Sequence, residues 1–356
     1  MKRNRRQGGF TLVELMVSVT LGMMIMAVLA VAFASSSQAR RDTDQASRQI
    51  ENGRYAMQLL SEDLALAGYY AEFDPFPMSS PGAKPDPCAT SVASLKAAMP
   101  LHVQGYDNPT AATAAALTCL SDVRTGADIV VIRRVSTCVA GSTDCDAFAG
   151  GTTQAWFQAS LCASASELDS SNLTDYYAMD TATAGLTKHK RDCTTLADLH
   201  RFVTHIYFIA NNDNAGDGIP TLKRAELGAT GFTIVPLVEG IENLQYEYGL
   251  DTSATPDGAP DVFTADPDNY TGAGSVGAVG NWRNVVALRV NLLARNTDST
   301  PGYSDTKVYT LGHNADGSAN TCTPDASPLC TGLSYKRHAF VAEVRVTNPS
   351  QRGITP

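Results

Sequence analysis

One apolar segment near the amino terminus constrains this chain more than any other feature. Residues 10–34 form an uninterrupted run of 25 residues in which Glu14 is the one charged residue. An α-helix rises about 1.5 Å per residue, so a helical run of this length can cross the hydrocarbon core of a bilayer. Four of the first six residues are basic, and positively charged flanks stay in the cytoplasm. The sequence therefore predicts a membrane-spanning helix that leaves the rest of the chain on the exported side.

Three interpretations of this segment compete. A cleaved signal peptide would have a shorter apolar stretch, although the small residues at 30–32 or 32–34 could serve as its cleavage site. A plain membrane anchor explains the length but gives no role to Glu14. A charged side chain in the hydrocarbon region costs roughly 2.5–3.5 kcal/mol near the centre and less near an end, so it usually has a partner. The third interpretation rests on the residues around Glu14.

The run from Gly9 to Glu14 reads Gly-Phe-Thr-Leu-Val-Glu and lies between a short basic leader and the apolar helix. This arrangement resembles the processing site of type IV prepilins and type II secretion pseudopilins. The resemblance implies that prepilin peptidase removes residues 1–9 as a leader peptide, cutting after Gly9 and methylating the new amino terminus at Phe10. It also implies that Glu14 approaches the terminal amine of a neighbouring subunit in a filament. Because burial costs both charges, the main effect of such a pair would be axial register.

The helical pattern continues beyond the apolar segment. No proline precedes Pro75, and small and apolar residues recur at steps of three and four between residues 46 and 67. The charged residues assigned to the opposite face are Arg40, Arg41, Asp44, Arg48, Glu51, Glu62 and Asp63. A continuous helix over residues 10–67 would be about 87 Å long. We therefore expect a transmembrane and filament-core half, residues 10–35, followed by an amphipathic half, residues 36–68.

The remaining residues, 69–356, are rich in strand-forming segments. Runs of β-branched and aromatic residues, separated by Gly, Pro, Asn and Asp clusters, lie at 128–135, 201–209, 232–238, 243–248, 284–293 and 337–346. Residues 75–109 are crowded with Pro, Ser and Ala and predict a long loop or insertion. The pattern predicts an α+β fold in which the long amino-terminal helix packs on a mainly antiparallel β-sheet body. Residues 136–200 are a candidate inserted lobe of this periplasmic domain.

All eight cysteines lie in the predicted β-rich body. None belongs to a C-x-x-C pair, and their surroundings are rich in Thr, Ser, Asp and Gly. This pattern favours disulfides in an oxidising compartment over a zinc site. Eight cysteines allow about 105 pairings, of which pairing in sequence order closes the shortest loops. The preferred disulfides are Cys88–Cys119, Cys138–Cys145, Cys162–Cys193 and Cys322–Cys330.

The charge balance argues against a nucleic-acid-binding surface. Without the four basic residues of the leader, 23 Lys and Arg residues stand against 36 Asp and Glu residues, a formal charge of −13. Proteins that wrap nucleic acid neutralise phosphates with a basic surface, and this composition shows none. We therefore expect no direct binding of nucleic acid.

Several motif-like patterns have simpler explanations. Residues 272–277 match G-x-G-x-x-G, but the required context of a preceding strand and a following helix is missing. His200 and His205 would face opposite sides of one strand without an obvious acidic partner, which favours structural roles. Acidic loops at 211–220 and 251–261 offer oxygen ligands for Ca²⁺, but neither follows the EF-hand pattern, so solvated turns are favoured. We expect no catalytic residue, metal or cofactor.

Further blocks of the chain extend the resemblance beyond the amino terminus. Together, these blocks resemble the PilW family of minor pilins: residues 52–60, 67–69, 237–244, 248–251, 282–293 and 337–348. The resemblance implies a non-enzymatic protein that begins in the inner membrane and is then incorporated into a type IV pilus at the cell surface. Its implied partners are prepilin peptidase, inner-membrane lipid, other minor pilins, the major pilin and a PilY-type tip adhesin. It would prime pilus assembly or sit at the tip, and so support twitching motility, adhesion or DNA uptake.

Two alternatives remain at this stage. PilW-like proteins are similar to the type II secretion pseudopilin GspJ, so the filament could belong to a secretion system. From another class, the chain could be a membrane-anchored periplasmic hydrolase whose site lies in residues 75–200, a region that matches no family named above. Such an enzyme would need a cleft with convergent His, Asp or Ser side chains.

Overall fold

A computed structural model describes residues 9–351 of the chain. Most of the predicted leader peptide, residues 1–8, therefore lies outside the described residues. The described chain divides into two units, the first ending at Arg48 and the second beginning at Gln49.

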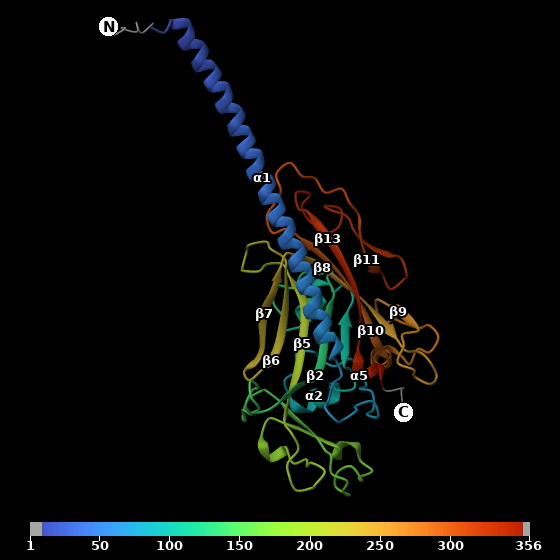
Figure 1. Cartoon of the computed structure of the whole chain (residues 1–356). Helices are drawn as coiled ribbons and strands as arrows, with labels where there is room; N and C mark the ends of the chain where they lie inside the picture. The colour runs from blue at the N-terminus through green and yellow to red at the C-terminus, as the bar shows by residue number, and fades with distance from the viewer. Residues whose placement is uncertain (1–8, 352–356) are drawn as a thin grey trace, which may run out of the picture. The chain divides into compact units, whose positions relative to one another are not determined.

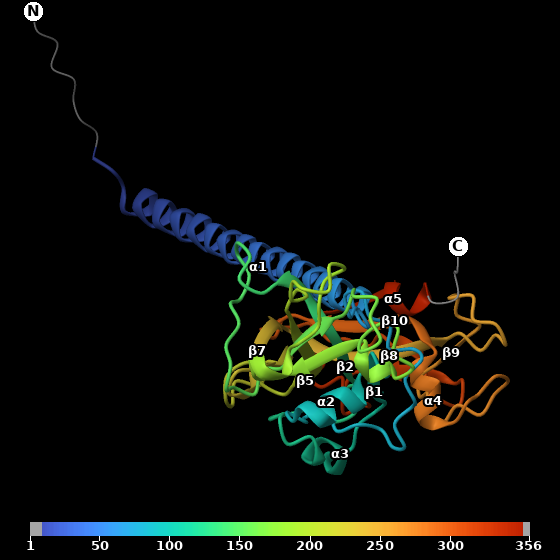
Figure 2. The ribbon, with the colours of Figure 1, turned by 90° about the horizontal axis from the view of Figure 1, so that it is seen from below.

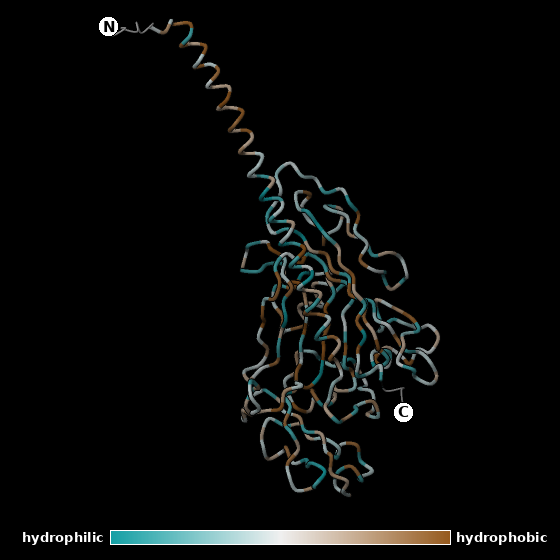
Figure 3. Tube along the Cα trace, in the orientation of Figure 1, coloured by the Kyte–Doolittle hydropathy of each residue, from teal (hydrophilic) through white to brown (hydrophobic). Residues whose placement is uncertain are grey.

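Helix α1 runs from Leu12 to Ala65 and contributes its first part to the first unit and its last part to the second. The helix predicted for residues 10–67 is thus confirmed to within two residues at each end. Its first part is coloured as strongly hydrophobic in Figure 3, and its large apolar side chains are exposed, from Leu12 to Phe33. Among the residues that the structure describes, α1 is the one helix long and apolar enough to cross a membrane.

The second unit contains two antiparallel sheets (Figure 1). The larger sheet consists of β1 (Val103–Tyr106), β2 (Ile129–Val139), β3 (Trp156–Ala159), β4 (Tyr177–Asp180), β5 (His200–Ala210), β6 (Thr221–Gly228) and β7 (Gly231–Glu239). Strand β5 lies centrally, because it pairs with β2, β3 and β6. Strands β3 and β4 place part of residues 136–200 in this sheet.

The second sheet has four strands in the order β13-β10-β8-β9. Its members are β8 (Ile241–Leu250), β9 (Val262–Thr264), β10 (Val285–Arg295) and β13 (Arg337–Arg345). Leu292 of β10 lies opposite Leu244 of β8 on one side and Phe340 of β13 on the other. A separate hairpin is formed by β11 (Tyr309–His313) and β12 (Ala319–Cys322) within the long connection between β10 and β13.

Four short α-helices also belong to the described part of the second unit: α2 (Val92–Ala98), α3 (Ala111–Ala116), α4 (Ala278–Arg283) and α5 (Thr347–Ser350). Two single-turn 3-10 helices lie at Leu173–Asp175 and Thr183–Gly185. The expectation of a long loop over residues 75–109 is wrong in part, because α2 and β1 lie within it. Helix α2 forms because Ser91 caps its first turn and because Leu95 is buried on its inner face.

The main core joins the last part of α1 with both sheets. Leu60 and Leu64 of α1 are fully buried against Val130 and Tyr207 of the larger sheet and against Leu288 of the smaller one. Burial of side chains of this size stabilises the fold by roughly 1.5–3 kcal/mol each. Helix α1 approaches β13 so closely that a Cβ at Gly53 would lie 2.1 Å from the ring of Phe340. A side chain at position 53 would therefore have to displace the Phe340 ring.

A second apolar layer covers the opposite face of the larger sheet. Successive strand residues point to opposite faces, so Ile129 and Val131 turn away from α1 and pack with Leu117, which directly follows α3. Figure 2 shows α3 on the side of this sheet remote from α1. All six long strand segments predicted from the sequence are present, as β2, β5, β7, β8, β10 and β13.

The eight cysteines form four disulfides, and the pairs follow sequence order. Their Cα atoms are 4.9–5.9 Å apart, within the normal range for a disulfide. The bonds are Cys88–Cys119, Cys138–Cys145, Cys162–Cys193 and Cys322–Cys330. Three of the four tie loops of the larger-sheet region, where regular structure is sparse.

Candidate functional site

The amino-terminal segment presents the predicted processing residues at the start of α1. Gly9 and Phe10 precede the helix, and the Phe10 side chain is 90% exposed. Glu14 lies in the first helical turn, where its Oε2 accepts hydrogen bonds from the backbone N–H of Thr11 (3.0 Å) and from Thr11 Oγ1 (2.9 Å). The N–H of Glu14 in turn donates to Thr11 Oγ1 at 3.3 Å. This reciprocal arrangement is a capping box, and it fixes the helix start two residues after the predicted cleavage site.

The first part of helix α1, which follows the processing residues, is apolar on all sides. Between Leu12 and Phe33 every large hydrophobic side chain is about half or more exposed in the isolated chain. A helix that is apolar all round is stable only when another apolar phase covers it, either lipid or neighbouring helices. Glu14 is the single carboxylate on this part of the helix, so it is the one residue there that could form an ion pair with a positively charged partner.

The last part of α1 is fixed to the body by polar contacts as well as by the core. Gln49 Nε2 donates to the backbone carbonyls of Ala294 (2.8 Å) and Lys336 (3.0 Å), which lie at the ends of β10 and β13. Its side chain is buried, so the amide satisfies two carbonyls that would otherwise face the helix. Helix α1 is thereby tied to the smaller sheet.

Asp63 ties the other end of α1 to the larger sheet. Its Oδ1 accepts from Arg134 Nε of β2 at 2.8 Å, while its Oδ2 lies 2.5 Å from His205 Nδ1 and accepts from Tyr207 OH at 2.8 Å. The assignment of Asp63 to the solvent-facing side of the helix is therefore wrong. Its carboxylate is buried between α1 and the larger sheet, where side chains of β2 and β5 bind it. The interpretation of His205 as lacking an acidic partner is wrong for the same reason.

This cluster keeps the Asp63 carboxylate ionised inside the protein. Burial alone would raise its pKa, but the hydrogen bond and charge of His205, the charge of Arg134 and the hydrogen bond from Tyr207 hold the pKa below its ordinary value. Burial, followed by the Asp63 charge, raises the pKa of Tyr207, which stays a neutral donor. His200 is not part of the cluster, since its Nδ1 contacts the carbonyl of Ser136 at 2.8 Å.

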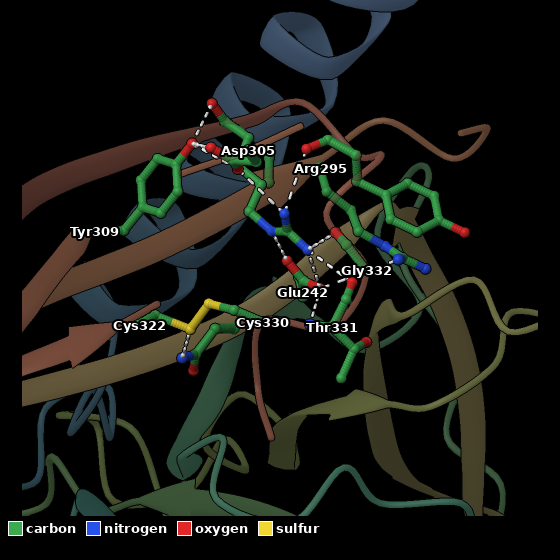
Figure 4. A network of polar contacts seen from close by, with 12 residues as sticks. Glu242, Arg295, Asp305, Tyr309, Cys322, Cys330, Thr331 and Gly332 are labelled. Atoms are coloured by element: carbon green, nitrogen blue, oxygen red, sulfur yellow. Dashed lines mark hydrogen bonds and ion pairs between the residues drawn. A yellow bond between two sulfur atoms is a disulfide. The ribbon is translucent and has the colours of Figure 1, made fainter. Parts of the chain in front are cut away.

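A second buried charge network holds the connection between β10 and β13 (Figure 4). Arg337 is paired with Glu242 and Asp305, and the side chains of all three are fully buried. The guanidinium also donates to the carbonyls of Thr331 (2.7 Å) and Gly332 (3.0 Å), next to the Cys322–Cys330 disulfide. Although burial disfavours the charge, Glu242 and Asp305 raise the pKa of Arg337. The network is structural, because it is sealed from solvent.

The patterns that could have indicated other chemistry have structural roles. Residues 272–277 lead into the six-residue helix α4, so the expectation that no helix follows is wrong, but no strand directly precedes them. In the acidic loops, Asp217 accepts from the N–H groups of Asn214 and Ile219, and Asp251 accepts from Gly258. These carboxylates stabilise turns. Among residues 9–351 no group of His, Cys, Asp or Glu side chains is arranged to hold a metal ion.

An apolar amino-terminal helix that begins in a Thr11–Glu14 capping box, followed by a β-rich, disulfide-bonded body, is the arrangement of a prepilin-type protein. The model described as the prokaryotic N-terminal methylation motif matches residues 4–30, and the model described as type IV pilus-assembly protein W, PilW, matches residues 206–348. Over residues 206–348 the chain is similar to the PilW family of type IV pilus assembly proteins, and its amino terminus carries the prepilin N-methylation motif.

The matched region of the body runs from the middle of β5 to α5, whereas residues 31–205 lie outside both matches. No curated protein and no solved structure gave a significant match to the chain. PilW is a structural pilin family and not a known enzyme family, so it lends no support to the hydrolase alternative. The apolar helix and the motif are consistent with anchoring in the inner membrane before pilus assembly.

Proposed function

We propose that this chain is a minor pilin, matured by prepilin peptidase between Gly9 and Phe10, N-methylated at Phe10 and inserted into a type IV pilus through α1. The observation that carries the proposal is the methylation motif, which spans the Gly9–Phe10 bond and the start of a capped helix with an exposed apolar surface. An exposed scissile bond supports access by the peptidase, and the apolar helix supports storage of the mature subunit in inner-membrane lipid.

Glu14 is the proposed assembly contact. Before assembly its carboxylate is satisfied by Thr11 of its own helix. In a filament, the methylated amine of Phe10 from a neighbouring subunit supplies a positive charge to the same carboxylate. Moving an ion pair into an apolar bundle gives little net stabilisation, but a wrong axial position leaves an unpaired buried charge, which is strongly unfavourable. The pair therefore selects one register between neighbouring helices.

The body would act by contacts with other subunits. The proposed partners are other minor pilins, the major pilin and a PilY-type adhesin, with the chain priming assembly or lying at the pilus tip. Four disulfides suit a body that functions outside the reducing cytoplasm.

The proposal is tested first by mass spectrometry of the mature amino terminus. We expect a methylated Phe10 as the first residue, and an unprocessed chain when Gly9 is replaced by Val. A start after Ala32 or Ala34 would show instead that the segment is a cleaved signal peptide. Glu14→Ala should be processed normally but enter pili poorly, whereas Glu51→Ala, which changes an exposed acid on the same helix, should assemble normally.

A deletion experiment separates the pilus from the secretion alternative. Loss of surface pili, restored by the wild-type chain but not by Glu14→Ala, supports the pilus assignment. Normal pili combined with a defect in protein secretion would assign the chain to a type II secretion pseudopilus.

A further inference from the structure

Strand β13 leaves one long edge of the smaller sheet open. It stands at the end of the strand order and pairs with β10 alone, over all nine of its residues and without a register shift. Apart from that pairing, the backbone of β13 makes one hydrogen bond within residues 9–351, in which the Arg337 carbonyl accepts from Tyr309 OH at 3.5 Å. A strand with a single neighbour turns half of its N–H and C=O groups away from that neighbour. Another strand can pair with those groups.

The other edges of the two main sheets are short or interrupted. Strands β1 and β4 have four residues each, and β9 has three. Strand β7 has nine residues, but Pro236 has no N–H to donate, and the pairing of β7 with β6 shifts register next to this proline. Short length, proline and bulges are the usual protection of a sheet edge against unwanted pairing. Within the described residues of these two sheets, β13 is the one long edge strand with none of the three.

One face of β13 is open to solvent. Phe340 and Ala342 pack on the main core. Because successive residues of a strand point to opposite faces, Val341, Glu343 and Arg345 face away from that core. The exposed fraction is 66% for Val341 and 52% for the Glu343 side chain, and Arg345 is exposed as well. A strand added at this edge would therefore lie next to an apolar residue, an acid and a base, in that order along β13.

The two charges on this face are incompletely paired within the chain. The Arg289 guanidinium contacts both Glu343 (3.2 Å) and Glu247 (3.5 Å), so two carboxylates share one guanidinium. Arg345 donates from Nε to Ser350 Oγ (2.7 Å) and from Nη2 to the Ser350 carbonyl (3.3 Å), and both acceptors are neutral. Opposite charges across a strand pair stabilise it, whereas like charges destabilise it. The edge thus favours a strand with a base opposite Glu343 and an acid opposite Arg345.

We propose that the free edge of β13 binds an extended segment of another protein, which adds to the smaller sheet as an antiparallel strand. All strand pairs of the described sheets are antiparallel, which sets the expected direction. From its amino terminus, the segment carries an acid, a base and an apolar residue at alternate positions, opposite Arg345, Glu343 and Val341. Backbone pairing supplies the affinity, and the three side chains select the partner. This inference does not depend on the proposed role in the pilus.

The test uses the full chain in detergent and a fluorescent peptide with the sequence Thr-Glu-Thr-Lys-Thr-Val-Thr. We expect binding with a Kd of roughly 10–100 µM by fluorescence anisotropy, with slower hydrogen exchange over residues 337–345 and no change over β7. Two further peptides are N-methylated at alternate residues, because one of the two sets of peptide N–H groups faces β13 and the other faces away. One of these peptides should bind about tenfold or more weakly, and the other should bind like the parent peptide.

Two charge reversals test the register. Glu343→Lys should weaken binding of the parent peptide by about fivefold or more, and a peptide with Glu in place of Lys should bind this variant better than it binds the wild type. Glu239→Lys, which makes the same change at the exposed end of β7, should leave binding unchanged.

Three results would overturn the proposal: no protection of residues 337–345 by the parent peptide, equal binding of the two N-methylated peptides, or equal effects of the two charge reversals. A dimer of the chain in light scattering that protects residues 337–345 without peptide would also overturn it, and would assign the edge to a second copy of this chain.

Discussion

Arg337 and Glu242 form a two-point ion pair in which neither side chain is exposed to solvent. Arg337 Nε donates to Glu242 Oε2 at 2.6 Å, and Arg337 Nη2 donates to Glu242 Oε1 at 3.1 Å. The pair joins β8 to the start of β13, and the two strands flank β10 on opposite sides. A further hydrogen bond from Arg337 Nη1 to Asp305 Oδ2 (3.1 Å) brings in the long connection after β10. One guanidinium therefore fixes three segments that are far apart in the sequence.

Loss of this guanidinium should be strongly destabilising. Arg337→Met removes the counter-charge of Asp305 and leaves Glu242 with Arg295 alone, at 4.0 Å. Breaking a buried pair in this way costs about 3–5 kcal/mol. The loss is measured as the free energy of unfolding of the full chain in urea. Arg54→Met, at an exposed position on α1, should change that free energy by less than about 0.5 kcal/mol. Equal effects of the two substitutions would show that the buried network contributes nothing to stability.

The long elements of this fold could be predicted because their patterns repeat. Helix α1 and the six long strands each contain enough residues for periodicity or a run of β-branched residues to be recognised. Strand β3, with four residues from Trp156 to Ala159, is too short for that. It becomes a strand because β4 and β5 lie on either side of it, and that pairing spans distant parts of the chain.

The buried charges were harder to predict for a related reason. The position of Asp63 on the helix next to Glu62 indicates a solvated face, and its burial is decided by Arg134, His205 and Tyr207, which are 71, 142 and 144 residues away. Arg337 did carry a signal, as a charged residue at the start of a strand-like run. The buried indole N–H of Trp156 makes no hydrogen bond within the described residues. This could not be predicted, because a sequence does not show which buried polar groups lack a partner.

Asp63 and Glu62 provide a matched pair of substitutions on one helical turn. Asp63 is buried in the polar cluster, whereas Glu62 is exposed and accepts from Gln58 at 2.8 Å. Asp63→Asn should lower the free energy of unfolding at pH 7 by about 3 kcal/mol, because it leaves the largely buried guanidinium of Arg134 without its counter-charge. Glu62→Gln should have an effect below about 0.5 kcal/mol.

The Asp63→Asn deficit should also depend on pH. The pKa of Asp63 is lowered in the folded state, so its contribution is present above the unfolded pKa, about 3.9, and is lost as the pH falls through the lower folded value. Unfolding measured from pH 7 down to pH 3 should show the difference between wild type and variant shrinking below about pH 4. A difference that stays constant over this range would mean that the charge of Asp63 is not the cause.

Asp107 should show the opposite pH dependence. Burial, with a further contribution from the Asp266 carboxylate, raises the pKa of Asp107 to about 6. Its favourable contribution is therefore complete below the unfolded pKa of about 3.9 and is lost as the pH rises through about 6. Asp107→Asn keeps a neutral side chain at every pH. Because the side chain is partly exposed, we expect the variant to be more stable than wild type at pH 7 by on the order of 1 kcal/mol.

The difference between Asp107→Asn and wild type should be largest at pH 7 and small at pH 4, because pH 4 lies well below the folded pKa of about 6 and close to the unfolded pKa of about 3.9. Asp42→Asn, at a position on α1 outside the second unit, is the control for removal of one negative charge from the chain. The measurement is the free energy of unfolding in urea at pH 4, 5, 6 and 7. A larger free energy of unfolding for wild type than for the variant at pH 7 would show that Asp107 is ionised and well paired in the folded protein.

Thr11 should control how readily Glu14 enters a filament. The Thr11 hydroxyl bonds to the Glu14 carboxylate and also accepts from its N–H, so it provides polar contacts for a charge that otherwise faces an apolar phase. Thr11→Val keeps the β-branched shape and removes these contacts. We expect normal cleavage after Gly9 but fewer copies in sheared pili, because in the membrane the Glu14 carboxylate keeps the bond from the backbone N–H of residue 11 and loses the bond from the hydroxyl. Thr11→Ser, which restores the hydroxyl, should recover most of the loss.

Incorporation is measured as the ratio of pilus-bound to membrane-bound chain on immunoblots. If Thr11→Val assembles as well as Thr11→Ser, the capping box has no part in assembly, and Glu14 alone sets the register of α1.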